Sequence, residues 1–406
     1  MTTRKHFEEY EGQTRYKHLI LGDYLDAWVK ILGSKFDRLA YVDGFCGPGT
    51  YYDDQGVGHD GSPVIALRVA DRHSGRTRVE CVFTDKNASF CEQLEEKLRQ
   101  AVPQGNYAVH AGDFDALMSG VLGAVMHDTP SFVFVDPCGW TGYPMRTIER
   151  ILSQPRTEVL INFMFNAINR HLTADGVPVG PSFGNLYGFD EAQLQTFRDE
   201  VAGVSREARE RKILDGYLTE LRKHAKFVWP FKLKFVDKDR TYYYLIHATN
   251  EFLGMKVMKE VMFSAGGQSL AYSALGPQDS QLSMFPEEPT VDDLASYLMN
   301  LYAGKERTFD QILEETYAFT PFIEKHYREA LKGAWRAGTL EVTQVDSQRA
   351  YALRGADRIR FPTHPAGSLF ATATEERRCH VCGSDQAPIE VEVAGRREFR
   401  CPLCRP

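Results

Sequence analysis

Residues 39–50 read Leu-Ala-Tyr-Val-Asp-Gly-Phe-Cys-Gly-Pro-Gly-Thr, an apolar run followed by an acidic residue and a glycine-rich turn. The run at 39–42 predicts a buried strand. The turn contains Gly44, Gly47 and Gly49, and glycine lets a backbone approach a ligand closely. Asp43 places a carboxylate where the strand ends. This order is typical of the first strand–turn–helix element of a nucleotide-binding parallel sheet.

Later parts of the chain repeat this pattern of a strand that ends in an acid. Apolar runs that predict strands, alternating with helices, occupy residues 78–84, 107–110, 131–135 and 158–163. Acidic residues follow the first three of these runs, at Asp85, Asp113 and Asp136. In open α/β sheets, ligands bind at the carboxyl ends of the strands. The acids therefore predict a ligand site along one edge of a parallel sheet.

The end of this region breaks the alternation of strands and helices. Two aromatic-rich runs, 227–236 and 241–249, are joined by four charged residues and predict a β-hairpin. A final antiparallel strand on an α/β run resembles the Rossmann-like, seven-stranded sheet of class I methyltransferases. At the other end, residues 14–32 predict an amphipathic helix. Lys17 and His18 near its start are expected at an exposed helix end rather than facing a ligand.

The composition limits the classes of protein to which the chain can belong. A chain of 406 residues with 43% hydrophobic content is ordinary for two or three globular domains. No stretch has the length of a membrane span, and residues 1–10 are unlike a signal peptide, so we expect a cytoplasmic protein without membrane contact. Against a net charge of −7, residues 206–240 hold eleven Lys and Arg and six Asp and Glu. This segment is either a surface for a polyanion or a helix face with internal ion pairs.

Two nucleotide interpretations of the glycine turn can be compared with the sequence. The dinucleotide fingerprint needs a third glycine, which is missing after Gly47-Pro48-Gly49, and no phosphate-binding Gly-Lys-Ser/Thr is present. Asp43-Gly44-Phe45-Cys46-Gly47-Pro48-Gly49 instead resembles motif I of S-adenosylmethionine (SAM)-dependent amino-methyltransferases that act on nucleic acids. Those enzymes have an Asp-x-Phe-x-Gly-x-Gly loop.

This resemblance implies a role for each acid. The backbone of residues 44–49 would curve round the methionine part of SAM, with Asp43 near its amino group. Asp85 would accept hydrogen bonds from both ribose hydroxyls. Asp113 would bind the adenine amino group, with Phe114 beside the ring. The alternative for each acid is a turn or a helix N-cap; Ser62, followed by Pro63, is expected to cap the next helix.

Asp136-Pro137-Cys138-Gly139-Trp140 stands where amino-methyltransferases have Asn/Asp-Pro-Pro-Tyr/Phe. The resemblance implies that Asp136 and the backbone around Pro137 accept hydrogen bonds from an exocyclic amine, while Trp140 stacks on the base. The rate enhancement would then come mainly from positioning the amine for methyl transfer. Cys138 replaces the second proline, and either a nucleophile, as in cytosine-C5 chemistry, or a buried thiol fits this position. We expect a buried thiol.

Residues 14–263 as a whole resemble the three-Cys-motif partner protein (TcmP) family of class I methyltransferase-like proteins. The residues that match are Tyr24-Leu25, Trp28, Asp43 to Gly49, Gly61-Ser62-Pro63, Asp136-Pro137-x-Gly139, Ile161-Asn162-Phe163-Met164 and Ala248-Thr249-Asn250-x-x-x-Gly254-x-x-x-Met258. The resemblance implies SAM binding but indicates no substrate. The name of the family refers to a separate cysteine-motif protein as a partner.

After a helix expected at 250–263 and a linker at 264–289, residues 290–361 predict a winged helix. Thr290 and Thr308 are expected to cap two helices, Thr320-Pro321 to start a third, and residues 339–345 and 350–353 to form a hairpin. The alternative is a helical cap used for dimer contacts.

Residues 375–406 predict a zinc ribbon. Eighteen residues separate Cys379-x-x-Cys382 from Cys401-x-x-Cys404, and four thiolates form a closed, structural Zn²⁺ site. A hairpin of 389–393 with 397–400 would join the two cysteine pairs, and His380 is expected outside the ligand set.

The sequence therefore predicts a SAM-dependent methyltransferase domain at 1–263 that acts on nucleic acid, DNA or RNA, at an exocyclic amino nitrogen. The alternative is a non-catalytic subunit with a methyltransferase fold, which docks a partner protein or nucleic acid through the winged helix and the zinc ribbon.

Overall fold

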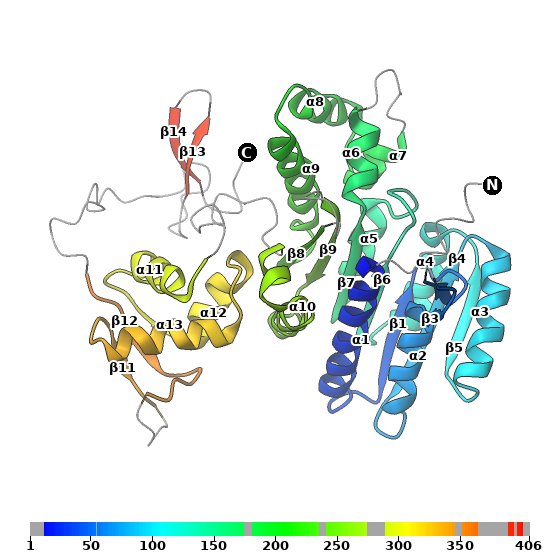
Figure 1. The fold of residues 1–406 in the computed structure, drawn as a ribbon, viewed down its shortest axis with the longest axis horizontal. Helices are drawn as coiled ribbons and strands as arrows, with labels where there is room; N and C mark the ends of the chain where they lie inside the picture. The colour runs from blue at the N-terminus through cyan, green and yellow to red at the C-terminus, as the bar shows by residue number, and fades with distance from the viewer. Residues whose placement is uncertain are drawn as a thin grey trace. The chain divides into compact units, whose positions relative to one another are not determined.

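The computed structural model describes residues 12–53, 55–173, 181–234, 241–273, 289–345, 351–363, 389–393 and 396–400. The chain divides into two compact units, Met1–Pro277 and Gln278–Pro406, which are described separately (Figure 1). None of the helices in the described part of the chain has the length and apolar character to span a membrane.

The first unit is built on a seven-stranded sheet in the order β5-β4-β1-β6-β7-β9-β8. The strands are β1 (Arg38–Asp43), β4 (Arg78–Asp85), β5 (Tyr107–Ala111), β6 (Ser131–Val135), β7 (Thr157–Phe163), β8 (Phe227–Lys234) and β9 (Thr241–Thr249). The pairs from β5 to β7 are parallel, and β9 runs antiparallel to both of its neighbours. This confirms the Rossmann-like methyltransferase sheet that the sequence predicts.

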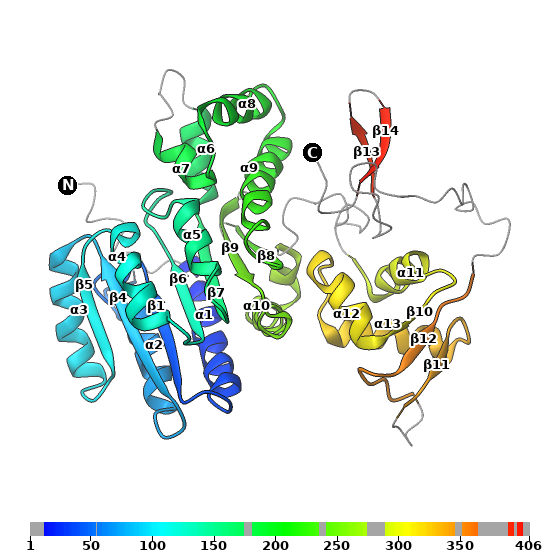
Figure 2. The same ribbon diagram turned by 180° about the vertical axis from the view of Figure 1, so that it is seen from behind.

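Helices cover both faces of this sheet (Figure 2). They are α1 (Gly12–Leu32), α2 (Ser62–Arg72), α3 (Ala88–Ala101), α4 (Phe114–Val121) with a π-helical turn (Leu122–Met126), α5 (Met145–Leu152), α6 (Phe165–Thr173), α7 (Pro181–Tyr187), α8 (Glu191–Val201), α9 (Arg206–Leu221) and α10 (Phe252–Ser273). Helix α1 packs between α2 and α10. Helices α6, α7 and α8 stand beyond the edge where β6 and β7 end (Figure 1).

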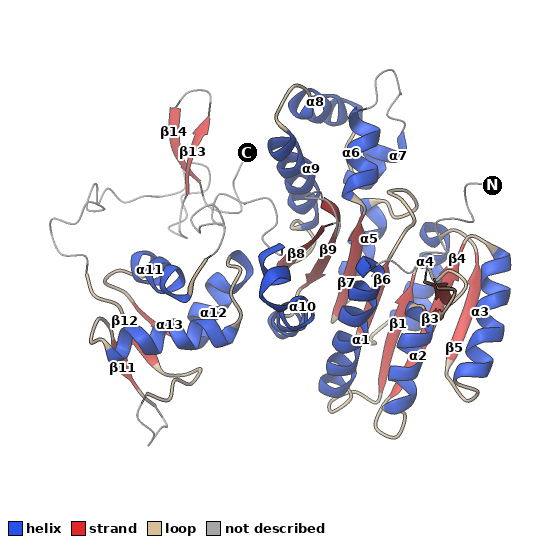
Figure 3. Ribbon diagram, viewed as in Figure 1, coloured by secondary structure: helices blue, strands red, loops and turns tan. Residues whose placement is uncertain are grey.

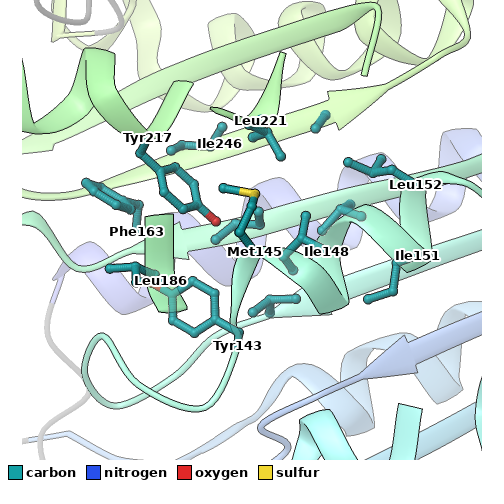
Figure 4. Packing of buried hydrophobic residues seen from close by; sticks show 14 of the residues in the cluster. Tyr143, Met145, Ile148, Ile151, Leu152, Phe163, Leu186, Tyr217, Leu221 and Ile246 are labelled. Carbon is teal, nitrogen blue, oxygen red and sulfur yellow. The ribbon is translucent and has the colours of Figure 1, made fainter. Parts of the chain in front are cut away.

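One large apolar cluster supports the segment that follows β6. Figure 4 shows Met145, the first residue of α5, beside Tyr217 of α9, and Tyr143 from the segment before α5 near Leu186. Strand β7 is buried along its whole length, and alternate residues point to opposite faces of a sheet. Val159, with Ile161 and Phe163, belongs to this cluster. Glu158 and Asn162 therefore point to the opposite face, which α1 covers.

Three local features of the first unit differ from expectation. Residues 50–60, for which the sequence indicates no strand, contain a small hairpin of β2 (Thr50–Tyr52) and β3 (Gly58–Asp60). Gly61 rather than Ser62 is the N-cap of α2, because the Ser62 hydroxyl bonds instead to Asp43. Helix α10 continues past its expected end at residue 263 to Ser273.

The second unit contains a winged helix, shown with its helices and strands in Figure 3. Its elements are α11 (Val291–Leu301), β10 (Glu306–Thr308), α12 (Phe309–Thr316), a 3₁₀ turn (Tyr317–Phe319), α13 (Glu324–Arg336), β11 (Glu341–Thr343) and β12 (Arg358–Arg360). The strands form one sheet in the order β10-β12-β11. Thr290 and Thr308 cap α11 and α12 as predicted.

Two predictions in the winged helix are wrong. Helix α13 begins at Glu324, because the Thr320 hydroxyl is 2.7 Å from the hydroxyl of Tyr327 and caps no helix there. The second strand of the hairpin is β12 at 358–360 rather than 350–353. The buried carboxylate of Asp357 accepts hydrogen bonds from the backbone N–H groups of Val345 and Arg354, and this fixes the turn before β12.

The predicted hairpin near the C-terminus is confirmed as β13 (Ile389–Val393) paired with β14 (Arg396–Arg400). The cysteines predicted to bind zinc, Cys379, Cys382, Cys401 and Cys404, lie outside the described residues.

Candidate active site

The turn after β1 needs glycine for steric reasons. Gly47 and Gly49 have φ angles of 58° and 79°, a region that other residues rarely occupy. A Cβ atom on Gly44 would lie 2.6 Å from the ring of Phe114, and one on Gly49 would lie 2.6 Å from Leu94. Phe114 therefore lies beneath the turn, where its ring centroid is 5.5 Å from that of Phe45. The two predicted aromatic residues thus support the turn.

Asp43 is fully buried at the end of β1. Its Oδ1 accepts a hydrogen bond of 3.2 Å from the Phe45 N–H, and the hydroxyls of Tyr41 and Ser62 also bond to the carboxylate. Burial raises the pKa of Asp43 to about 7, and the negative charge of Asp136 contributes in the same direction. These two predicted site residues are therefore close enough to repel each other electrostatically.

Asp85 binds the glycine turn directly. Its Oδ2 accepts a hydrogen bond of 3.1 Å from the Gly47 N–H, and its Oδ1 accepts one of 2.8 Å from the Asn87 N–H. Asp113 is exposed, and its side chain caps α4 by accepting a hydrogen bond from the Ala116 N–H. Asp85 thus lies within the site, while Asp113 lies at its outer rim.

Asp136 forms the centre of the polar site. The Lys17 ammonium donates to its Oδ2 over 2.5 Å, and the Asn162 amide donates to its Oδ1 over 2.5 Å. Both side chains of the Lys17–Asp136 pair are only 9% exposed. The prediction that Lys17 and His18 occupy an exposed helix end is wrong, since both are buried. Lys17 follows the helical spacing of the apolar stripe of α1. This spacing is the sequence signal that indicates its burial.

His18 and Tyr51 add two aromatic groups to the same site. Their ring centroids are 5.4 Å apart. Burial, and then the positive charge of Lys17, lowers the pKa of His18 to about 3, so its imidazole is neutral at pH 7. Burial also raises the pKa of the Tyr51 phenol, with contributions from Asp136 and other acidic groups nearby. Tyr51 belongs to the β2–β3 hairpin, which the sequence did not indicate as structured.

The segment after Asp136 reaches the surface. Pro137 is buried, but Cys138 is exposed, so the prediction of a buried thiol at 138 is wrong. Partial desolvation and the charge of Asp136 raise the pKa of Cys138 to about 11, which leaves little nucleophilic thiolate at pH 7.

Trp140 packs against the helices beyond the sheet edge. Its ring centroid lies 4.8 Å from that of His171 and 5.4 Å from that of Phe183. A cavity of about 170 Å³ opens beside Trp140, lined in part by Asp113, Tyr143 and Asn185. The cavity therefore connects the predicted adenine-binding acid with the predicted base-stacking ring.

Two other predicted features are outside this site. In the segment 206–240, Lys223 pairs with Glu220, and Lys232 pairs with the largely buried Glu210. The first pair is three residues apart at the end of α9 and the second joins β8 to α9, so both interpretations of this segment stay open. Among the described residues, no group of three or more His, Cys, Asp or Glu side chains is placed to hold a metal ion.

Comparison with known families gives one match, to a family described as a GMT-like winged helix-turn-helix (wHTH) domain, over residues 273–347. This confirms the winged helix. No curated protein matches the sequence.

Similar solved structures include two O-methyltransferases and a ribosomal RNA methylase. TomG of Streptomyces achromogenes, in complex with SAM, is 13% identical over 57% of this chain and 79% of its own, with a TM-score of 0.32. The enzyme of Bacillus cereus, in complex with SAH, is 14% identical over 56% and 80%, with a TM-score of 0.31. A putative rRNA methylase of Clostridium thermocellum is 9% identical over 56% and 97%, with a TM-score of 0.27. The fold assignment rests on the strand order.

The raised pKa of Asp43 predicts a specific pH dependence of stability. Between pH 4 and 7 the folded protein keeps a proton on Asp43 that the unfolded chain, with an Asp pKa of about 3.9, has lost. The free energy of unfolding should therefore fall as pH rises through this range, by up to about 4 kcal/mol from this group. Urea unfolding of Asp43→Asn should lack this contribution, whereas Asp128→Asn, at an exposed acid, should follow the wild type. Parallel curves for wild type and Asp43→Asn would contradict the assignment.

Proposed function

We propose that the protein is a SAM-dependent methyltransferase that acts on nucleic acid at an exocyclic amino nitrogen. The observation that carries this proposal is the convergence of the glycine turn, Asp43 and the Lys17–Asp136 pair at the carboxyl edge of the sheet. Ligands of open α/β sheets bind at this edge.

The residues at the turn fit SAM. Asp43 is a fully buried carboxylate whose pKa burial raises to about 7, and it makes no ion pair with a described residue as Asp136 does with Lys17. The SAM ammonium would supply a positive charge there. Asp85 would accept bonds from the ribose hydroxyls with lone pairs not used by Gly47 and Asn87, and Asp113 with Phe114 would lie at the adenine. When bound, SAM supplies a methyl group activated by a sulfonium centre.

Asp136 is suited to orient an amine acceptor. Lys17 and Asn162 together fix the orientation of the carboxylate. Each carboxylate oxygen has a second lone pair and can accept a further N–H bond from an amine. Asp136 and the backbone at Pro137 would thereby hold the amine with its nitrogen lone pair toward the methyl group, while Trp140 contacts the base.

The winged helix supports a nucleic-acid substrate. Winged helices are helix-turn-helix variants. The second helix of this motif, called the recognition helix, commonly binds DNA. In this unit α13 exposes Lys325 and Arg336, and Arg358 and Arg360 of β12 have side chains that are 65% and 67% exposed. These cations would contact phosphates.

One observation favours the non-catalytic alternative. Both oxygens of Asp136 already accept a hydrogen bond from the protein's own side chains, as expected if the carboxylate only stabilises the fold. In that case the protein would bind SAM or a partner, such as a three-Cys-motif protein, without transferring a methyl group.

Calorimetric titration with SAM tests the cofactor site. Wild type should bind one equivalent, and Asp85→Ala should weaken binding by about tenfold or more, through the loss of charge-assisted hydrogen bonds. The affinity should also fall as pH is lowered through 7, because Asp43 gains a proton and no longer attracts the ammonium. Asp199→Ala, at an exposed acid of α8, serves as the control. An absence of heat in the wild type would sink the cofactor assignment.

Transfer of labelled methyl groups to DNA and to tRNA tests the reaction. Asp136→Ala and Lys17→Met should lower incorporation by about 100-fold, the range expected when an acceptor is mispositioned, while SAM affinity changes little. Wild type that binds SAM but labels neither pool would favour the non-catalytic alternative. Unchanged incorporation in Asp136→Ala would show that the acceptor assignment is wrong.

We also propose that Cys379, Cys382, Cys401 and Cys404 hold a structural Zn²⁺ ion. Elemental analysis of purified protein should find about one zinc per chain. The double variant Cys379→Ser/Cys401→Ser should lose it, since thiolates are the ligands, and Cys138→Ser should retain it. Zinc near zero in the wild type would exclude the ribbon.

A further inference from the structure

A second cavity lies at the opposite edge of the sheet from the candidate active site. It has a volume of about 240 Å³ and lies between the end of α1 and the start of α10. Lys35 and Phe36, which line it, precede β1, and Arg156, which also lines it, precedes β7. The amino ends of the strands therefore face this cavity, and none of the proposed catalytic residues contributes to it.

The walls of the cavity are mainly apolar. They are formed by Trp28, Ile31, Leu32, Phe36, Leu253 and Val257. The Leu253 side chain is on the surface, with 47% of the residue exposed, whereas Trp28 is 3% exposed. The cavity thus offers an open mouth and a buried interior of a size that suits a small organic molecule.

A buried carboxylate stands at the interior end. Glu158 lines the cavity, and its side chain is only 5% exposed. Its Oε2 accepts hydrogen bonds from the Tyr24 hydroxyl and from His247 Nε2, the latter over 2.8 Å. Within the described part of the chain, no hydrogen bond to Oε1 accompanies them. A buried carboxylate oxygen gains from a positively charged donor.

Helix α10 is shaped to admit this carboxylate. A Cβ atom on Gly254 would lie 2.6 Å and 2.7 Å from the two oxygens of Glu158, so a larger residue at this position would displace the carboxylate. Trp28 provides a further polar group, since its buried Nε1–H has no hydrogen-bond partner among the described residues. The interior therefore presents both an acceptor and a donor.

The ionisable residues of the lining carry no net charge when Glu158 is included. Arg156 and Lys35 contribute positive charge, and Glu251 and Glu158 contribute negative charge; Glu158 is the buried member of the four and stands in the interior. We propose that this cavity binds a small primary amine with an apolar body, whose ammonium group pairs with Glu158 Oε1. A plain amine and an amino acid share this chemistry.

Calorimetric titration of the full-length protein at pH 7 with 2-phenylethylamine, and with the neutral 2-phenylethanol of the same shape, tests the proposal. The amine should bind about tenfold or more tightly than the alcohol, the difference expected of a charge-assisted hydrogen bond. L-Phenylalanine distinguishes the two sources. Tighter binding than the amine indicates an amino acid, and weaker binding indicates a plain amine.

Two variants separate binding from folding. Glu158→Gln should abolish the preference for the amine, and Val257→Trp should block both ligands by filling the mouth without touching the Tyr24–Glu158–His247 bonds. Glu80→Gln, at a carboxylate on β4, should bind as the wild type does. Equal affinity for amine and alcohol, no binding of the amine to wild type, or a preference that survives in Glu158→Gln would each overturn the proposal.

Discussion

The ion pair between Lys17 and Asp136 is the interaction on which the candidate site depends. Both side chains are almost fully buried, so each charge has lost most of its hydration and relies on the other. Removing one partner of such a pair typically costs about 3–5 kcal/mol, because the remaining charge is left uncompensated. Asp43 lies close enough for its pKa to respond to Asp136. Lys17 pairs with Asp136, while Asp43 makes no ion pair with any residue that the structure describes, so the site favours a second cation beside Asp43.

The same helix links the two edges of the sheet. Lys17 and Trp28 lie eleven residues apart on α1, which corresponds to roughly 16 Å at 1.5 Å per residue. Strand β7 runs alongside, with Glu158 and Asn162 on the face toward α1. The Tyr24–Glu158 bond at one end and the Lys17–Asp136–Asn162 bonds at the other therefore fix α1 lengthwise in an otherwise apolar interface. An apolar interface alone would define this position less strictly.

The sheet was predictable from sequence because buried parallel strands are continuous apolar runs bounded by turns. The ends of these strands also gave Asp43, Asp85 and Asp136 correctly as residues of one edge. Lys17 was misjudged because a lysine near a helix end is usually exposed, and its partner is 119 residues away in sequence. Strand β12 was misplaced because three residues are too few to show alternation. Both errors arose because the sequence pattern does not show which contacts form in the tertiary structure.

The charge distribution of the site bears on the acceptor atom. A hydroxyl acceptor must lose its proton before or during methyl transfer, which requires a strong base, whereas an amine attacks with a free lone pair and loses its proton afterwards. Asp136 is paired with Lys17 and bonded to Asn162, and each of its oxygens can accept a further N–H bond. The neutral His18, with its pKa near 3, is a poor base. A neutral His18 and a paired Asp136 would therefore suit the proposed nitrogen acceptor better than a hydroxyl.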